Sequence, residues 1–269
     1  MELDVLPVNR FFDYRNVFAA TAFTDVSHSI RMARAVKSAL EIEMIRQAAR
    51  RADQVAASLP DVIREGIPEI ELAGLVEAKA RQLGHQGVIR MRLWGAELFY
   101  GHLMAGPSAA VPSYLASPTG GAAVSSAVAQ GPSFRPIKGH EPILVDYVFT
   151  YNGYLADHAR IYSIGPLSDK LMRAHQDMLS LQKQLKKSAK AGICSGDVYA
   201  EATEKAAAMG YQDNFMGADT ERIKFVGHGV GIELDEYPFL AQGQKLILQA
   251  GMTLALEPKL IFPGYGVVG

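Results

Sequence analysis

Four residues in this sequence stand out as candidate ligands for a hard divalent metal ion: Asp146, Asp157, His228 and Glu257. Carboxylate oxygens and imidazole nitrogens are common protein ligands for such ions. A bound ion of this kind can activate a water molecule and polarise a carbonyl group. The four residues lie far apart along the chain, so the fold must bring them together.

The two aspartates lie on a predicted hairpin, in which two β-rich runs flank the dipeptide Asn152-Gly153. This dipeptide is the strongest short signal for a two-residue type I′ turn. A symmetric turn places Asp146 opposite Ala159, so Asp157 shares its face as a diagonal neighbour at roughly 7–8 Å. Two carboxylates there repel each other and resist loss of water, and a divalent cation removes both costs. The alternative to metal binding is that one aspartate is a solvated strand residue and the other a helix cap or turn former.

The other two residues favour metal binding over that alternative. His228 lies among glycines at positions 227, 229 and 231, which lets backbone and metal approach closely. Glu257 ends a mostly apolar run, and Pro258 follows it, so a buried carboxylate in need of a counter-charge is expected. A histidine taken singly is more often a core residue than a ligand. Three carboxylates in the same set make ligation the better interpretation.

The order of these residues resembles the pita-bread metallopeptidases, which include methionine aminopeptidase, aminopeptidase P and prolidase, with creatinase as a metal-free relative. The resemblance runs from about Arg34 to Gly269 and includes 153-GYLADHARIYSIG-165 and 250-AGMTLALEP-258. It implies an α+β pita-bread fold with two duplicated helix-helix-strand halves related by pseudo-twofold symmetry.

The resemblance also implies a site with two divalent metal ions. Asp146 would bind one ion through both oxygens, Asp157 would bridge to the second, His228 would bind through its ring, and Glu257 would complete the site. Glu257 would also act as a catalytic residue by shuttling a proton to the leaving nitrogen. For such ligands we expect Mn²⁺ or Co²⁺, with Zn²⁺ or Fe²⁺ as alternatives.

The sequence departs from the family pattern at several positions. Asp235 stands where the family has an auxiliary histidine, and either Ser113 or Gln130 stands where it has another substrate-facing histidine. We predict that these three residues and His102 bind substrate, and that Asp235 also takes part in catalysis. Ala159 replaces a threonine usually found after the second aspartate. The alternative to substrate binding for His102 is a structural role as a core or edge-strand histidine.

The family's fifth ligand is a glutamate in a strand like 264-GYGVVG-269, which ends before reaching one. We therefore expect the chain to be a fragment, with its metal site empty or singly occupied. Residues 1–36 are predicted to be a linker and the remnant of an N-terminal domain, and 37–269 the catalytic domain without its C-terminal end.

Composition sets the remaining limits. A net charge of −1 gives no sign of nucleic acid or an anionic membrane as partner. The single cysteine, Cys194, precludes an internal disulfide and a cysteine-based zinc site. No apolar run is long enough to span a membrane, so we expect a cytoplasmic protein. The family resemblance adds an expected homodimer.

Helical spacing and capping signals predict helices over 8–20, 38–59, 68–84, 168–192 and 195–210. Strands are expected over 87–94, 225–231 and 252–262, besides the hairpin, and an extended segment up to Arg34. Residues 105–142 are rich in Gly, Pro, Ser and Ala, which predicts a long loop at the mouth of the cleft. Plain surface disorder is the alternative for this segment.

The predicted activity is hydrolysis of a short peptide at an Xaa-Pro bond. Two alternatives remain: a creatinase-like hydrolase acting on a non-peptide amide, and a binding module with an eroded site. The retained ligand types argue against the first, and the missing auxiliary histidines favour the second.

Overall fold

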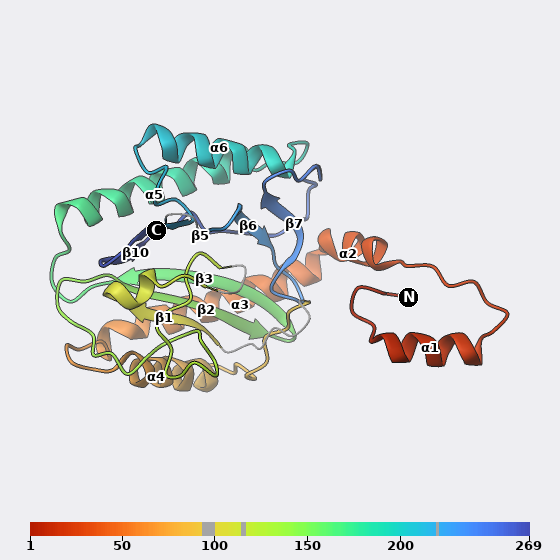
Figure 1. Ribbon diagram of the computed structural model, residues 1–269, viewed down its shortest axis with the longest axis horizontal. Helices are drawn as coiled ribbons and strands as arrows, with labels where there is room; N and C mark the ends of the chain where they lie inside the picture. The colour runs from red at the N-terminus through yellow and green to blue at the C-terminus, as the bar shows by residue number, and fades with distance from the viewer. Residues whose placement is uncertain (93–99, 114–116, 219–220) are drawn as a thin grey trace.

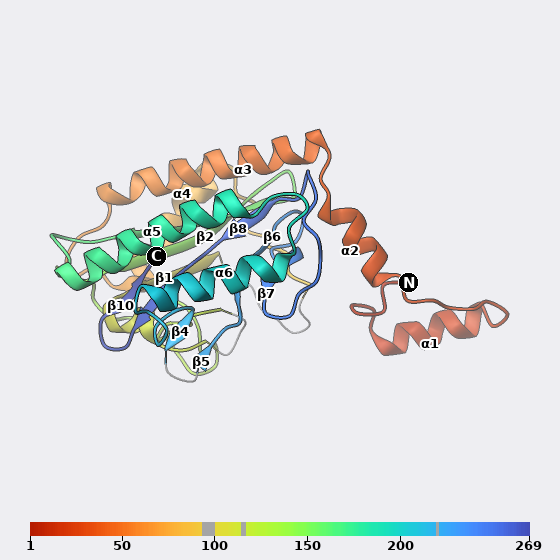
Figure 2. The same ribbon diagram turned by 90° about the horizontal axis from the view of Figure 1, so that it is seen from above.

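The structure is a computed structural model that describes residues 1–92, 100–113, 117–218 and 221–269. Two halves, each with a pair of helices and a set of strands, face one another (Figure 1). The strands of the two halves lie inside, with helices α3 and α4 on one side and α5 and α6 on the other (Figures 1 and 2).

The first half holds helices α3 (Ala39–Ser58) and α4 (Glu69–Gln82). Helix α3 begins with the predicted capping box, in which Ser38 and Glu41 bond each other's backbone N–H groups. The antiparallel sheet has the order β1-β2-β3, formed by β1 (Gly101–Ala105), β2 (Ile143–Tyr151) and β3 (Tyr154–Tyr162).

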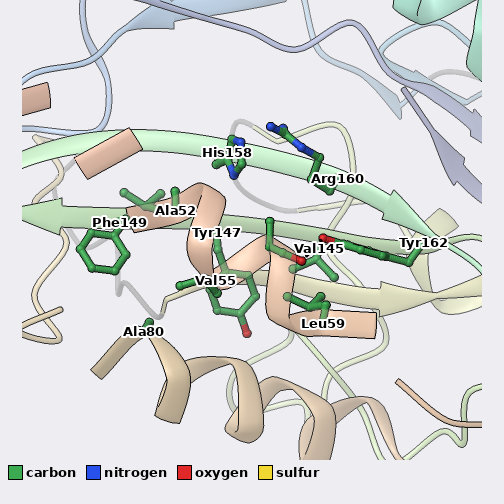
Figure 3. A pocket seen from close by; sticks show the side chains of 12 residues that line it. Ala52, Val55, Leu59, Ala80, Val145, Tyr147, Phe149, His158, Arg160 and Tyr162 are labelled. Carbon is green, nitrogen blue, oxygen red and sulfur yellow. Dashed lines mark hydrogen bonds between the residues drawn. The ribbon is translucent and has the colours of Figure 1, made fainter. Parts of the chain in front are cut away.

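One face of this sheet forms the first hydrophobic core. Figure 3 shows Val145 and Tyr147 of β2 beside Val55 of α3 and Leu59, which directly follows α3, with Ala80 of α4 below them. The gap left among these side chains is about 20 Å³, which is close to one water molecule. This face is closed core, so chemistry must take place on the other face of the sheet.

The second half repeats the pattern with helices α5 (Asp169–Ser188) and α6 (Ser195–Ala208). Its three-stranded sheet has the order β7-β6-β8, from β6 (Phe225–Gly229), β7 (Glu236–Ala241) and β8 (Leu254–Leu256). Two short pairs complete it: β4 (Gly217–Ala218) with β5 (Glu221–Arg222), and β9 (Leu260–Phe262) with β10 (Gly266–Val268). A second core lies between these strands and α5 and α6.

Helices α1 (Val8–Val17) and α2 (Ser27–Ala35) precede the two halves. Helix α1 has no buried residue and lies apart from the rest of the molecule (Figure 1). Helix α2 packs against β7. The domain boundary after residue 36 stays a prediction.

Two predictions about the elements were wrong. Residues 27–34, predicted as extended, belong to α2, and residues 87–92 form no strand, while 93 and 94 lie outside the described residues. Strands β4, β5 and β7 were not predicted. Within the described part of the chain, no helix is long and apolar enough to cross a bilayer.

Candidate metal centre

The hairpin has the register that the sequence predicts. Asp146 pairs with Ala159, and Val148 pairs with Asp157. Asn152 and Gly153 both have positive φ, 48° and 81°, as a type I′ turn requires. Because alternate residues of a strand share a face, both aspartates lie opposite the closed core.

His228 occupies the central strand β6, between β7 and β8. A Cβ atom added to Gly227 would lie 2.3 Å from the carbonyl oxygen of Ala255, and one added to Gly229 would lie 2.3 Å from that of Tyr237. The neighbouring strands therefore approach so closely that only glycine fits on either side of the histidine. This packing fixes the backbone from which the imidazole projects.

Asp157, His228 and Glu257 converge from three strands. Nε2 of His228 lies 2.8 Å from Oε1 of Glu257 and 3.4 Å from Oδ2 of Asp157. One ligand atom from each residue lies within 4.8 Å of the others. Glu257 follows β8, and its backbone N–H donates to the carbonyl of Val226 in β6, which holds it beside the histidine.

The other ring nitrogen of His228 has its own partners. Nδ1 lies 3.1 Å from the carbonyl oxygen of Gly229 and 3.5 Å from Oδ1 of Asp235. A proton on Nδ1 satisfies both acceptors and leaves the Nε2 lone pair directed at the two carboxylates, which is the arrangement a metal-binding histidine uses. Asp235 therefore lies where it orients the imidazole.

The electrostatics of the site reflect crowding of carboxylates. Burial and the neighbouring Glu257 raise the pKa of the Asp157 carboxyl to about 7. Burial opposes ionisation of Glu257 as well, but Lys259 and His228 hold its pKa below the usual range. Although burial works against it, hydrogen bonds to Asp157 and Glu257 raise the pKa of His228. The imidazole lies between these two carboxylates, so its protonated form offsets their negative charge.

Lys259, which sequence reasoning missed, is the fifth charged group of the site. Its Nζ donates to Oδ2 of Asp146 at 2.5 Å and to Oε2 of Glu257 at 2.8 Å. Despite burial, these two carboxylates raise its pKa, so it carries a full positive charge at neutral pH. A signal was present in the sequence: a lysine within an apolar run, two residues after Glu257, lies on the same face of an extended chain.

The predicted substrate-binding residues form a chain that leads to the site. His102 on β1 pairs with Asp146 on β2, so both project from the same face. Nε2 of Gln130 lies 3.3 Å from Nε2 of His102, and the Ser113 hydroxyl donates to Oε1 of Gln130 at 2.9 Å. Burial lowers the pKa of His102. The long loop thus contributes Gln130 to the site.

The structure separates the candidate ligands into two groups. Asp157, His228 and Glu257 form the three-ligand group, whereas Asp146 reaches it through Lys259. His158 is adjacent to Asp157 but projects from the opposite face of β3, where its Nε2 lies 3.1 Å from Oδ1 of Asp53 on α3.

The three-ligand group fits a divalent ion. Two carboxylates and an imidazole suit Mn²⁺, Co²⁺, Zn²⁺ or Fe²⁺. Asp157 and Glu257 are carboxylates that lie close together with little exposure, so their negative charges repel, and such an ion would supply the counter-charge.

Known proteins share both sequence and fold with this chain. The Xaa-Pro dipeptidase of Lactobacillus helveticus is 28% identical over 269 residues, covering all of this chain and 65% of its own length. An X-Pro aminopeptidase from Thermotoga maritima superposes with a TM-score of 0.82 at 25% identity, over 99% of this chain and 67% of that one. The prolidase from Pyrococcus horikoshii OT3 superposes with a TM-score of 0.80 at 25% identity, over 98% of this chain and 67% of that one.

The fold is therefore the α+β pita-bread fold that the sequence predicted. The chain spans about 65% of the length of the curated relatives that it matches. The sequence profile of one family, described as metallopeptidase family M24, matches residues 43–269. Since this match covers most of the chain and includes every candidate ligand, the chain belongs to metallopeptidase family M24.

Proposed function

We propose that the protein containing this chain is a metal-dependent peptidase that hydrolyses short peptides, with Xaa-Pro dipeptides as its substrate class. The observation that carries the proposal is the convergence of Asp157, His228 and Glu257 from separate strands. The names of the relatives support the substrate class, since several are Xaa-Pro dipeptidases.

A bound divalent ion would supply an activated water and would polarise the scissile carbonyl. The residues of the chain handle protons and orientation. Glu257 takes the proton from the attacking water and delivers it to the leaving proline nitrogen. Asp235 and the carbonyl of Gly229 keep the His228 proton on Nδ1, and His102, positioned by Gln130, faces the substrate.

A cavity of about 320 Å³ beside the centre supports a small apolar substrate with a free carboxylate. Its walls include the rings of Phe225 and Phe239, and His228 and Asp235 line it as well. Lys224 provides a cation at this cavity. An Xaa-Pro dipeptide matches this lining, because its pyrrolidine ring is apolar and its C-terminal carboxylate is an anion.

The test uses the complete protein, freed of metal with a chelator and then loaded with Mn²⁺ or Co²⁺. We expect hydrolysis of Ala-Pro and Leu-Pro that depends on the added metal, and slower hydrolysis of Ala-Ala. His228→Ala should abolish both metal dependence and turnover. His28→Ala, which changes an exposed histidine on α2, serves as the matched control.

Three outcomes would overturn the proposal in different ways. No turnover of any Xaa-Pro dipeptide or tripeptide by the loaded protein contradicts the peptidase function. Hydrolysis of a non-peptide amide by a metal-free protein supports the creatinase-like alternative. Peptide binding without turnover supports the binding module. The predicted homodimer is tested separately, by light scattering on the complete protein.

A further inference from the structure

Lys259 places a buried ammonium group inside the metal centre. The residue is 4% exposed, and its Nζ lies between one oxygen of Asp146 and one of Glu257. A lysine buried to this extent is rare unless it is paired, and here both partners are carboxylates expected to bind metal.

The backbone around Lys259 leaves it little freedom to move. Its carbonyl accepts a hydrogen bond from the N–H of Met216 at 3.0 Å, and its own N–H lies 3.3 Å from Sδ of Met216. Pro258 precedes it with a fixed φ, and β9 begins at Leu260. The backbone therefore fixes the point from which the side chain extends, and the two carboxylates hold the ammonium in the site.

We propose that the Lys259 ammonium takes the place of one of two metal ions, so that this centre binds a single divalent ion through Asp157, His228 and Glu257. The proposal rests on the metal dependence proposed above and specifies the number of ions. It also changes the role of Asp146, which becomes the partner of a protein cation rather than a bidentate metal ligand.

Charge balance supports a single ion. Among the described residues, Asp146, Asp157 and Glu257 place three negative charges around Lys259 and the three-ligand group. One ammonium and one divalent ion neutralise these three charges, whereas a second divalent ion beside the ammonium would add two positive charges next to a buried cation. Such an excess of positive charge is costly where water is scarce.

The positions of the carboxylate oxygens also favour a single metal ion. The Oδ2 atom of Asp146 and the Oε2 atom of Glu257 already accept from Lys259, whereas Oε1 of Glu257 faces His228. A second ion bridging Asp146 and Glu257 would compete with the ammonium for the same oxygen lone pairs and would be repelled by its charge. The ion at the three-ligand group can use Oε1 of Glu257 without displacing Lys259.

The first measurement needs no variant. Calorimetric titration of the metal-free complete protein with Mn²⁺, and elemental analysis after desalting, should give one ion per chain. Electron paramagnetic resonance of the loaded protein should show isolated Mn²⁺, without the exchange coupling of a pair. Two ions per chain, or a coupled spectrum, would overturn the proposal, and so would no bound ion at all.

Two variants then test the role of the ammonium directly. Lys259→Met and Lys259→Gln remove the charge at similar volume, and both should bind a second Mn²⁺ and give a coupled spectrum. Lys183→Met removes an exposed lysine from α5 and should keep one ion. If either charge-free variant folds, by circular dichroism, and still binds one ion, Lys259 does not exclude the second.

The same samples separate this inference from the proposed function. One ion in the parent and two in the Lys259 variants would uphold the inference even if no Xaa-Pro peptide is hydrolysed. Xaa-Pro hydrolysis by a parent protein holding two ions would uphold the function and refute the inference.

Discussion

Glu69 and Asp157 are both buried carboxylates, in opposite kinds of surroundings. Glu69, at the start of α4, is 0% exposed and accepts four hydrogen bonds. The N–H of Ala105 donates to its Oε1, and the N–H and hydroxyl of Ser133 and the hydroxyl of Ser108 donate to its Oε2, at 2.7–3.0 Å. All four of these donors are neutral groups, and they come from two segments, residues 105–108 and Ser133, which the carboxylate ties to α4.

Asp157 has a side chain only 9% exposed, but its neighbours include two more carboxylates, Glu257 and Asp146. The His228 ring, at 3.4 Å, provides limited compensation. The comparison shows that burial alone does not identify a functional carboxylate. A complete set of donors indicates a structural role, whereas crowding with like charges indicates a place for a cation.

The largest expected effect is at Asp157. Asp157→Asn removes a charged ligand, so Mn²⁺ affinity and peptide hydrolysis should fall by more than the roughly 10- to 100-fold typical of a ligand's outer partners. The fold should persist, because the change removes a repelled charge. Calorimetry and turnover assays measure the effect, with Asp53→Asn, on α3 at the opposite face of the hairpin, as control. Unchanged metal affinity would remove Asp157 from the ligand set.

Glu69→Gln should lower the stability of the fold and leave activity unchanged, which is the opposite of the effect expected for Asp157→Asn. The amide group cannot accept all four hydrogen bonds, so the free energy of unfolding should fall by about 1.5–3 kcal/mol. Activity per folded molecule should stay unchanged. Urea unfolding measures the loss, and Glu71→Gln, an exposed change on the same helix, should stay within about 0.5 kcal/mol of the parent. A specific loss of activity with full stability would contradict the structural role.

Removal of the metal tests the contrast between Glu69 and Asp157 by a change in the solution and not in the candidate ligands. An ion that binds only the folded state adds about 2.7 kcal/mol of stability at a concentration 100 times its dissociation constant. The parent protein and Glu69→Gln should both gain this amount when Mn²⁺ replaces chelator, and Asp157→Asn should gain much less. An equal gain in all three proteins would place the ion elsewhere.

The smallest effect concerns His85, a buried group satisfied in its neutral form. Its Nε2–H donates to the carbonyl of Val148 at 3.1 Å, and its Nδ1 accepts from the N–H of Gly87 at 2.8 Å. Burial lowers its pKa in the folded state. The unfolded chain therefore binds more protons as pH falls.

The stability contributed by His85 is fully present above the unfolded pKa of about 6.5 and decreases as pH falls toward the folded pKa, by at most about 1.4 kcal/mol per unit. Unfolding free energies measured between pH 8 and 5 should show a flatter pH dependence for His85→Asn than for the parent. His28→Asn should leave the slope unchanged. An unchanged slope in His85→Asn would show that the ring accepts a proton without cost.

The parts of the fold that the sequence predicted depend on local signals. The Asn152-Gly153 turn determined the register of the hairpin, and hence which face holds both aspartates. The capping box at Ser38 located the start of α3. In both cases the determining residues lie within a few positions of the structure that they specify.

The failures occur where partners distant in sequence decide the structure. Helix α2 lacks a side-chain cap, but Arg34 near its end pairs with Glu233 and with the buried Glu236 of β7. Strand β7 contains Pro238, which argues against a strand, and the pairing of β7 with β6 is irregular there. The spacing from Glu257 indicates which face Lys259 shares, but its pairing with Asp146, 113 residues away, does not follow from any local pattern.

The two-residue turn between β2 and β3 has an evolutionary consequence. An insertion of one residue that shifts the pairing would rotate Asp157 to the side of the sheet covered by α3, and would bring His158 to the metal. Relatives that retain the centre should therefore tolerate insertions at this loop only in even numbers, or with a compensating bulge. The length of this loop therefore decides which face of the sheet Asp157 occupies.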